Sequence, residues 1–96
     1  MTHPVPFKDD VLREALGLIE SDRQDQYGTP HENFGRWSHI CREIGFSLSP
    51  GDLALIMLAG KVARLGNRKT ILKRDNFVDA AGYASLAVHL YGDEVV

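Results

Sequence analysis

The sequence predicts an all-α fold, and three observations support that prediction. Apolar residues recur at steps of three and four along most of the chain, no segment alternates apolar and polar residues as a strand does, and Pro and Gly mark the ends of four helical segments. With 96 residues, 44% of them hydrophobic and 25% charged, the chain has the composition of a single globular domain, 1–96. We expect a four-helix bundle that is completed by self-association.

The first helix is expected at about 9–21, after an extended leader at 1–8 that contains two prolines. An aspartate at its start is a good N-cap, and apolar residues follow at helical spacing. The second helix is expected at about 30–44, because Thr29 is a favourable N-cap and Pro30 is favourable in the first helical position. A glycine after the apolar stripe ends this helix.

The third helix, at about 50–65, begins with the same device, because Ser49 precedes Pro50 and an acid follows at the third position. Its sequence "LALIMLAGKVARL" is apolar nearly all round, which predicts the most buried helix of the fold. The last helix is expected at about 75–91, and its run of small residues lets another helix approach closely.

Several classes of protein are disfavoured by the composition. No apolar run reaches the roughly 20 residues of a membrane span, and the N-terminus lacks a signal pattern, so a cytoplasmic protein without membrane contact is expected. A net charge of -2 argues against general nucleic-acid binding. The single cysteine, Cys41, excludes an internal disulfide and is interpreted as a core residue.

Two carboxylates, Asp75 and Asp79, are four residues apart at the start of the last helix and therefore lie on one face, with Tyr83 next along it. Such a pair can share a Mg²⁺ ion, which prefers oxygen ligands and usually binds one or two carboxylates together with substrate phosphates. Glu32 and Asn33 can add oxygen atoms if the helices pack side by side. The alternative is structural: Asp75 caps its helix, Asp79 favours the positive helix end, and Glu32 belongs to a capping box.

Two cations, Lys61 and Arg64, lie three residues apart on one face of the third helix, where the apolar pattern gives way to charge. Arginine binds phosphate oxygens in bidentate fashion and lysine binds them as a point charge, so both are candidate phosphate contacts. Alternatively, these cations only stabilise the C-terminal end of the helix dipole. Together with the acids, they are suited to holding a polyphosphate through metal and direct contacts.

Three ordered motifs resemble a known family: "DRQDQYGTPHENF", "SPGDLALIMLAGKVARL" and "DNFVDAAGYASLA". They are similar to a group of short, largely uncharacterised phage and prophage proteins, over about Val11 to Leu90. That group is distantly similar to the MazG-like and dimeric dUTPase enzymes, which are all-α, oligomeric, Mg²⁺-dependent nucleoside triphosphate pyrophosphohydrolases. The resemblance implies a nucleotide or nucleotide-like polyphosphate as ligand.

Carried over to this chain, the resemblance implies Glu32 and Asp79 as catalytic residues and Glu32, Asp75 and Asp79 as metal ligands. It implies six substrate-binding residues: Arg23, Tyr27, Asn33, Lys61, Arg64 and Tyr83. Arg23 would supply a cation, and Tyr27 a ring that stacks on a base. The alternative role of Tyr27 is as a hydrophobic staple for the second helix.

The chain departs from the enzyme pattern at two places. The enzymes have two Glu three apart on the first metal-binding helix, whereas here Gly35 stands three residues after Glu32. The last helix has Asp-x-x-x-Asp instead of a pair of acids three apart. Nucleotide binding is therefore better supported than Mg²⁺-dependent hydrolysis, and two alternatives remain open: a non-catalytic sponge for a signalling nucleotide, and a helical protein-interaction module without a ligand.

Overall fold

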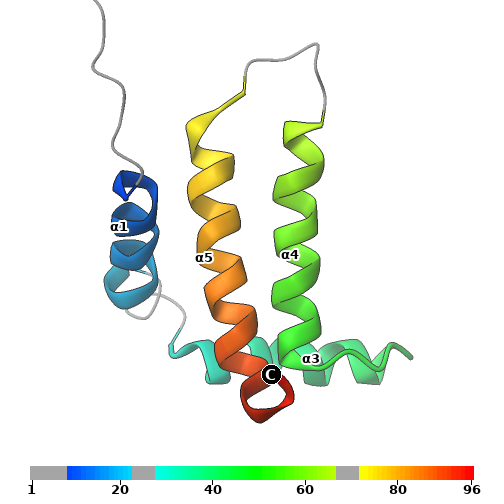
Figure 1. The fold of residues 1–96 in the computed structure, drawn as a ribbon. Helices are drawn as coiled ribbons and strands as arrows, with labels where there is room; N and C mark the ends of the chain where they lie inside the picture. Colours follow the sequence, from blue (N-terminus) through cyan, green and yellow to red (C-terminus); the bar gives the residue numbers. More distant parts are fainter. Residues whose placement is uncertain (1–8, 23–27, 67–71) are drawn as a thin grey trace, which may run out of the picture.

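The computed structural model describes residues 9–22, 28–66 and 72–96, and all regular structure in them is helical (Figure 1). The elements are α1 (Asp10–Gly17), the π-helical turn η1 (Leu18–Asp22), α3 (Pro30–Glu43), α4 (Pro50–Leu65), α5 (Arg74–Tyr91) and the 3₁₀ turn η2 (Gly92–Glu94). The prediction of an all-α fold with four helices is confirmed for this part of the chain. None of its helices is both long and apolar enough to cross a membrane.

The helices α4 and α5 run antiparallel and side by side, and they form the centre of the molecule (Figure 1). The helix α1 packs on α5 on the side away from α4, while α3 lies across the base of the pair. Residues from three of these helices form the main hydrophobic core: Phe34, Cys41, Leu53, Ala54, Tyr83, Leu86 and Ala87. Cys41 is therefore a buried core residue, as interpreted from the sequence.

The starts of α3 and α4 follow from the capping residues in the sequence. The Ser49 hydroxyl accepts a hydrogen bond from the amide of Asp52 at 3.1 Å, and the Asp52 carboxylate accepts one from the amide of Ser49 at 2.9 Å. This reciprocal pair satisfies two amides that the helix itself leaves without partners. At α3, the Thr29 hydroxyl accepts from the amide of Glu32 at 3.2 Å.

The most buried helix is α5, and the prediction that it would be the third helix is wrong. Five residues of α5 are buried, whereas the buried residues of α4 are confined to its first turns, at Gly51, Leu53 and Ala54. The reason is position: α5 has neighbours on several sides, with α1 on one and α4 on the other, while α4 has an outward face that the described chain leaves uncovered. A helix that is apolar all round does not by itself reveal which side will be covered.

Candidate functional site

An ion pair joins the two central helices. The Nζ atom of Lys61 in α4 lies 2.9 Å from an Oδ2 atom of Asp79 in α5, and the two side chains are only 16% and 21% exposed. Both residues are intermediate in burial, so water reaches the pair while the surrounding protein lowers the local dielectric. Lys61 and Asp79, which were both predicted to have functional roles, are therefore in direct contact.

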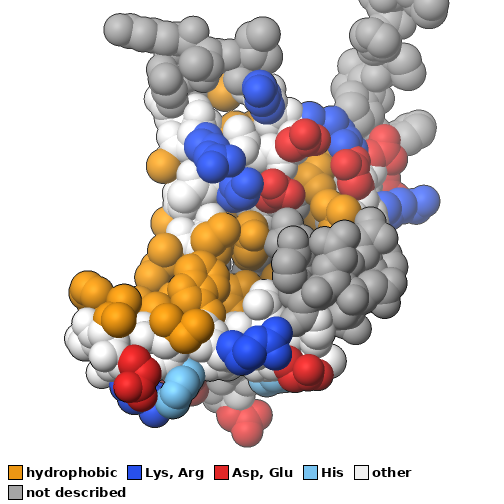
Figure 2. Space-filling view, turned by 180° about the vertical axis from the view of Figure 1, so that it is seen from behind, with side chains coloured by type: hydrophobic (Ala, Val, Ile, Leu, Met, Phe, Trp, Pro, Cys, Tyr) orange, Lys and Arg blue, Asp and Glu red, His pale blue; other side chains and the backbone are white. Residues whose placement is uncertain are grey.

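Arg64 and Asp75 extend this charged group along both helices. Arg64 follows Lys61 by one turn of α4, and Asp75 precedes Asp79 by one turn of α5. Because the helices are antiparallel, the C-terminal half of α4 lies beside the N-terminal half of α5, and both outer residues are exposed. Figure 2 shows basic and acidic side chains gathered at this end of the molecule, above an apolar surface. We call Lys61, Arg64, Asp75 and Asp79 the α4–α5 charged site.

A small hollow adjoins the charged site on the other side of α5. Its lining combines α1 and η1 with α5 and consists of Ala15, Leu18, Ile19, Val78, Asp79, Gly82, Tyr83 and Leu86. Asp79 is the one acid among apolar and aromatic neighbours. The volume of about 10 Å³ is near the minimum that holds one water molecule, so the hollow is too small for a nucleobase in this conformation. Tyr83 is buried in the core beside it.

Glu32 and Asn33 lie at the opposite end of α5. The rings of His31, at the start of α3, and His89, in the last turn of α5, have their centroids 4.7 Å apart, which places the start of α3 against the end of α5. His89 is ten residues after Asp79, a distance of about 15 Å along a helix. Glu32 is exposed and accepts a hydrogen bond from the Thr29 hydroxyl at 3.0 Å.

The three acids predicted as metal ligands are thus divided between the two ends of α5. Asp75 and Asp79 share one face of the helix, and Glu32 belongs to the other end. In residues 9–22, 28–66 and 72–96, no group of three His, Cys, Asp or Glu residues is arranged to hold a metal ion. Arg23 and Tyr27, the other two predicted contacts, lie outside the described residues.

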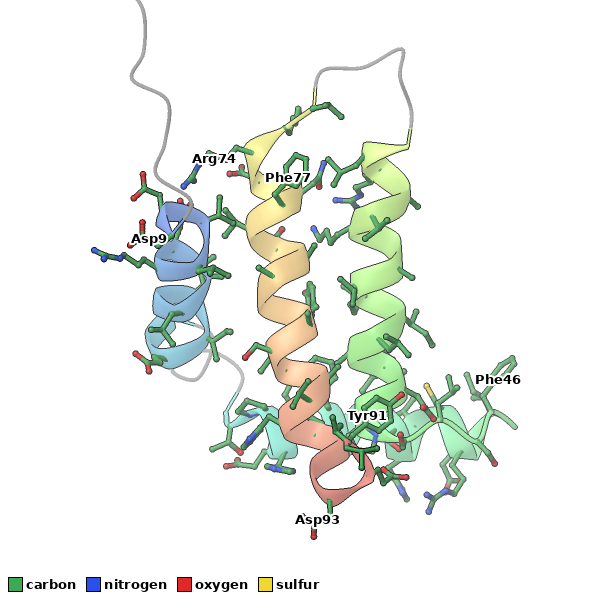
Figure 3. The ribbon with its side chains drawn as sticks, viewed as in Figure 1. Asp9, Phe46, Arg74, Phe77, Tyr91 and Asp93 are labelled. Carbon is green, nitrogen blue, oxygen red and sulfur yellow. The ribbon has the colours of Figure 1, made fainter. Side chains whose placement is uncertain are left out.

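Two contacts that hold this framework were not predicted from the sequence. Arg74, at the start of α5, donates a hydrogen bond to the carboxylate of Glu14 in α1. The N-cap of α5 is Lys73, so the alternative in which Asp75 caps this helix is wrong. At the base, the Tyr91 hydroxyl donates to the Asp52 carboxylate at 2.6 Å, and Figure 3 shows Tyr91 reaching from α5 to α4. Partners 60 and 39 residues apart leave no local pattern in the sequence.

The Tyr91–Asp52 hydrogen bond shifts the pKa of both groups. It raises the pKa of Tyr91 to about 12, because the bond to a carboxylate favours the neutral phenol. It also lowers the pKa of Asp52, with further help from the backbone amide of Ser49. The capping acid of α4 therefore has a second role as an anchor for the end of α5.

Comparison with known proteins gave a family and a phage relative. Residues 10–91 match the family described as a domain of unknown function, DUF6378. The chain is 34% identical over 90 residues to the Gene 55 protein of Mycobacterium phage D29, and the match covers 93% of this chain and 58% of that protein. The chain thus spans somewhat more than half of its relative's length. No solved structure matches it.

Proposed function

From the α4–α5 charged site, and because the chain belongs to the DUF6378 family and has a phage relative, we propose that it is a phage-type protein that binds a nucleotide or nucleotide-like polyphosphate. The partly buried Lys61–Asp79 pair is the observation that carries this proposal. Its ligand implies action in the cytoplasm, where nucleotides are abundant.

The pair supports the proposal through an exchange of partners. Separating two partly buried charges is costly when either one is left without a counter-charge. A Mg²⁺–polyphosphate complex supplies both counter-charges at once, because its phosphate oxygens can accept from Lys61 while its metal takes the carboxylate of Asp79. Arg64, exposed one turn further along α4, adds a donor for bidentate contact with a second phosphate.

Mg²⁺ fits this site as an ion that binds together with the phosphates, and not as an ion that the protein holds by itself. Asp75 and Asp79 provide two carboxylates on one helix face, and Mg²⁺ commonly takes one or two protein carboxylates while phosphate oxygens and water complete its shell. The protein thus binds the metal and the nucleotide together. Glu32 lies at the other end of α5, which agrees with a metal site that takes only Asp75 and Asp79 from the protein.

Hydrolysis between the α and β phosphates is the extension suggested by the MazG-like resemblance. It needs a metal-activated water, with Glu32 and Asp79 as the predicted catalytic pair. The separation of Glu32 from Asp79 along α5 favours the second candidate, a sponge that binds the nucleotide without cleaving it.

Thermal melting against nucleoside triphosphates and cyclic dinucleotides, with and without Mg²⁺, tests the proposal. A ligand at 100 times its dissociation constant stabilises by about 2.7 kcal/mol, which raises the Tm of a domain of this size by about 10 °C or more. Lys61→Gln should abolish this rise, while Arg42→Gln, at an exposed position of α3, should keep it. Equal rises in both variants, or no rise with any compound, would refute binding at this site.

Release of pyrophosphate then separates the enzyme from the sponge. With a compound that gives a Mg²⁺-dependent rise, the enzyme releases pyrophosphate and Asp79→Asn abolishes the release. The sponge returns the compound intact. Turnover that survives Asp79→Asn would exclude the catalytic role of Asp79.

A further inference from the structure

The outward face of α4 is apolar and uncovered in the described chain. Leu55, Ile56 and Val62 are each about half exposed, and the residues between and beside them on this face are small: Ala59, Gly60 and Ala63. The helix has no charged residue between Asp52 and Lys61. Lys61 does not interrupt the face, because its side chain is turned towards α5, where it pairs with Asp79.

The apolar surface continues onto the end of α3. Ile40 lies in the last turn of α3, Ile44 is the C-cap of this helix and Phe46 follows it, and all three are more than half exposed. In Figure 1 this end of α3 projects beyond α4, and Figure 3 shows Phe46 at its tip. Figure 2 shows the apolar side chains over α4 and the end of α3 as one surface. We call Ile40, Ile44, Phe46, Leu55, Ile56 and Val62 the α4 face.

The α4 face is large enough for a stable interface. A large apolar side chain that is half exposed or more offers about 100 Å², so six of them offer about 600 Å² before the small residues between them are added. This is at the upper end of the largest apolar patches on monomers and close to the roughly 800 Å² that each partner buries in a standard interface.

We propose that the α4 face binds a second copy of this chain, with the two α4 helices packed antiparallel about a twofold axis near Ala59. Under this symmetry Leu55 of each chain lies opposite Ala63 of the other, and Ile56 lies opposite Val62. Leu55 then meets a small side chain, Ile56 meets a branched apolar one, and Ala59 at the centre lets the backbones approach closely. The face is complementary to itself, which an isologous interface requires.

Charge selects the antiparallel arrangement. Asp52 precedes the α4 face and Arg64 follows it, so antiparallel helices bring the acidic end of each α4 to the basic end of the other. The helix dipoles are also opposed in this arrangement. Parallel helices would place Arg64 against Arg64. The projecting end of α3, which lies beside the start of α4, then receives the C-terminal half of the second α4.

Sedimentation and light scattering of the full chain test the interface. We expect a dimer, and Ile56→Glu should raise its dissociation constant at least about 100-fold by placing a charge in the interface. Leu12→Glu is the matched control, since Leu12 is also an exposed apolar residue but lies on α1. Circular dichroism checks that both variants stay helical. A monomeric wild-type chain, or equal weakening by both variants, would overturn the proposal.

Cross-linking tests the register even if Ile56→Glu does not fold. Two cysteines can form a disulfide when their Cα atoms are within about 7 Å, so Ala59→Cys should give a covalent dimer on oxidation. Leu12→Cys should not give a covalent dimer. Cys41 is buried and is present in both variants, so it does not account for a difference between them. Failure of Ala59→Cys to cross-link would overturn the pairing of the two α4 helices about Ala59. These outcomes do not depend on nucleotide binding, so they stand apart from the proposed function.

Discussion

A methyl group added at Gly51 should destabilise the fold, although alanine is the better helix former. Gly51 is buried in the first turn of α4, and a Cβ atom there would lie 2.5 Å from Cδ1 and 2.7 Å from Cγ and Cε1 of Tyr91. The ring cannot simply turn aside, because its hydroxyl is held by Asp52 at 2.6 Å. Overpacking of this kind costs about 1–3 kcal/mol, while the gain in helix propensity is at most about 1 kcal/mol.

We therefore expect Gly51→Ala to lower the free energy of unfolding by about 1–2 kcal/mol and the Tm by roughly 5–10 °C. Gly35→Ala is the control, because a Cβ atom at that position in α3 meets no atom within 4 Å. Chemical denaturation of both variants, repeated in a Tyr91→Ala background, gives a double-mutant cycle. A clash with the Tyr91 ring is refuted if Gly51→Ala stabilises the fold as Gly35→Ala does, or if Gly51→Ala costs the same free energy of unfolding when the ring is absent.

Two further predictions concern the contacts that join α5 to its neighbours. The pKa of Tyr91 is raised to about 12 in the folded protein, so the hydrogen bond from Tyr91 to Asp52 stabilises the fold fully below pH 10. This stabilisation is lost as the pH rises towards 12. Denaturation curves measured across that range should therefore show a smaller loss of stability in Tyr91→Phe than in the wild-type chain. Arg74→Gln removes the half-exposed ion pair with Glu14, which should change the overall free energy of unfolding little but raise amide exchange in α1 selectively. A uniform rise in exchange along the chain would contradict this role.

The local parts of the fold were predictable because their causes are local. Thr29-Pro30 and Ser49-Pro50 mark helix starts through hydrogen bonds that reach three residues, and the structure shows those bonds. The all-α class followed from the same signals together with apolar periodicity. The role of Glu32 in a capping box was open in the sequence, and the structure shows its carboxylate accepting from the Thr29 hydroxyl, a contact that differs from the bond to the Thr29 amide in such a box.

The sites depended on which helices became neighbours. Lys61 and Asp79 were separate candidates in the sequence, and their pairing required α4 and α5 to lie antiparallel in one particular register. Glu32 was expected to join Asp75 and Asp79, but α3 crosses the opposite end of α5. No spacing within one helix contains this information, because a helix can be rotated or shifted without changing its own pattern.

By itself, the sequence determined the helices and, to within a few residues, their ends, since capping and periodicity act over a few residues. Only the tertiary structure decided that α5 is the buried helix, that α4 keeps an apolar face uncovered in the described chain, and which acid meets which base. The physical reason is that burial and ion pairing depend on distances between segments far apart in the chain, which packing alone sets.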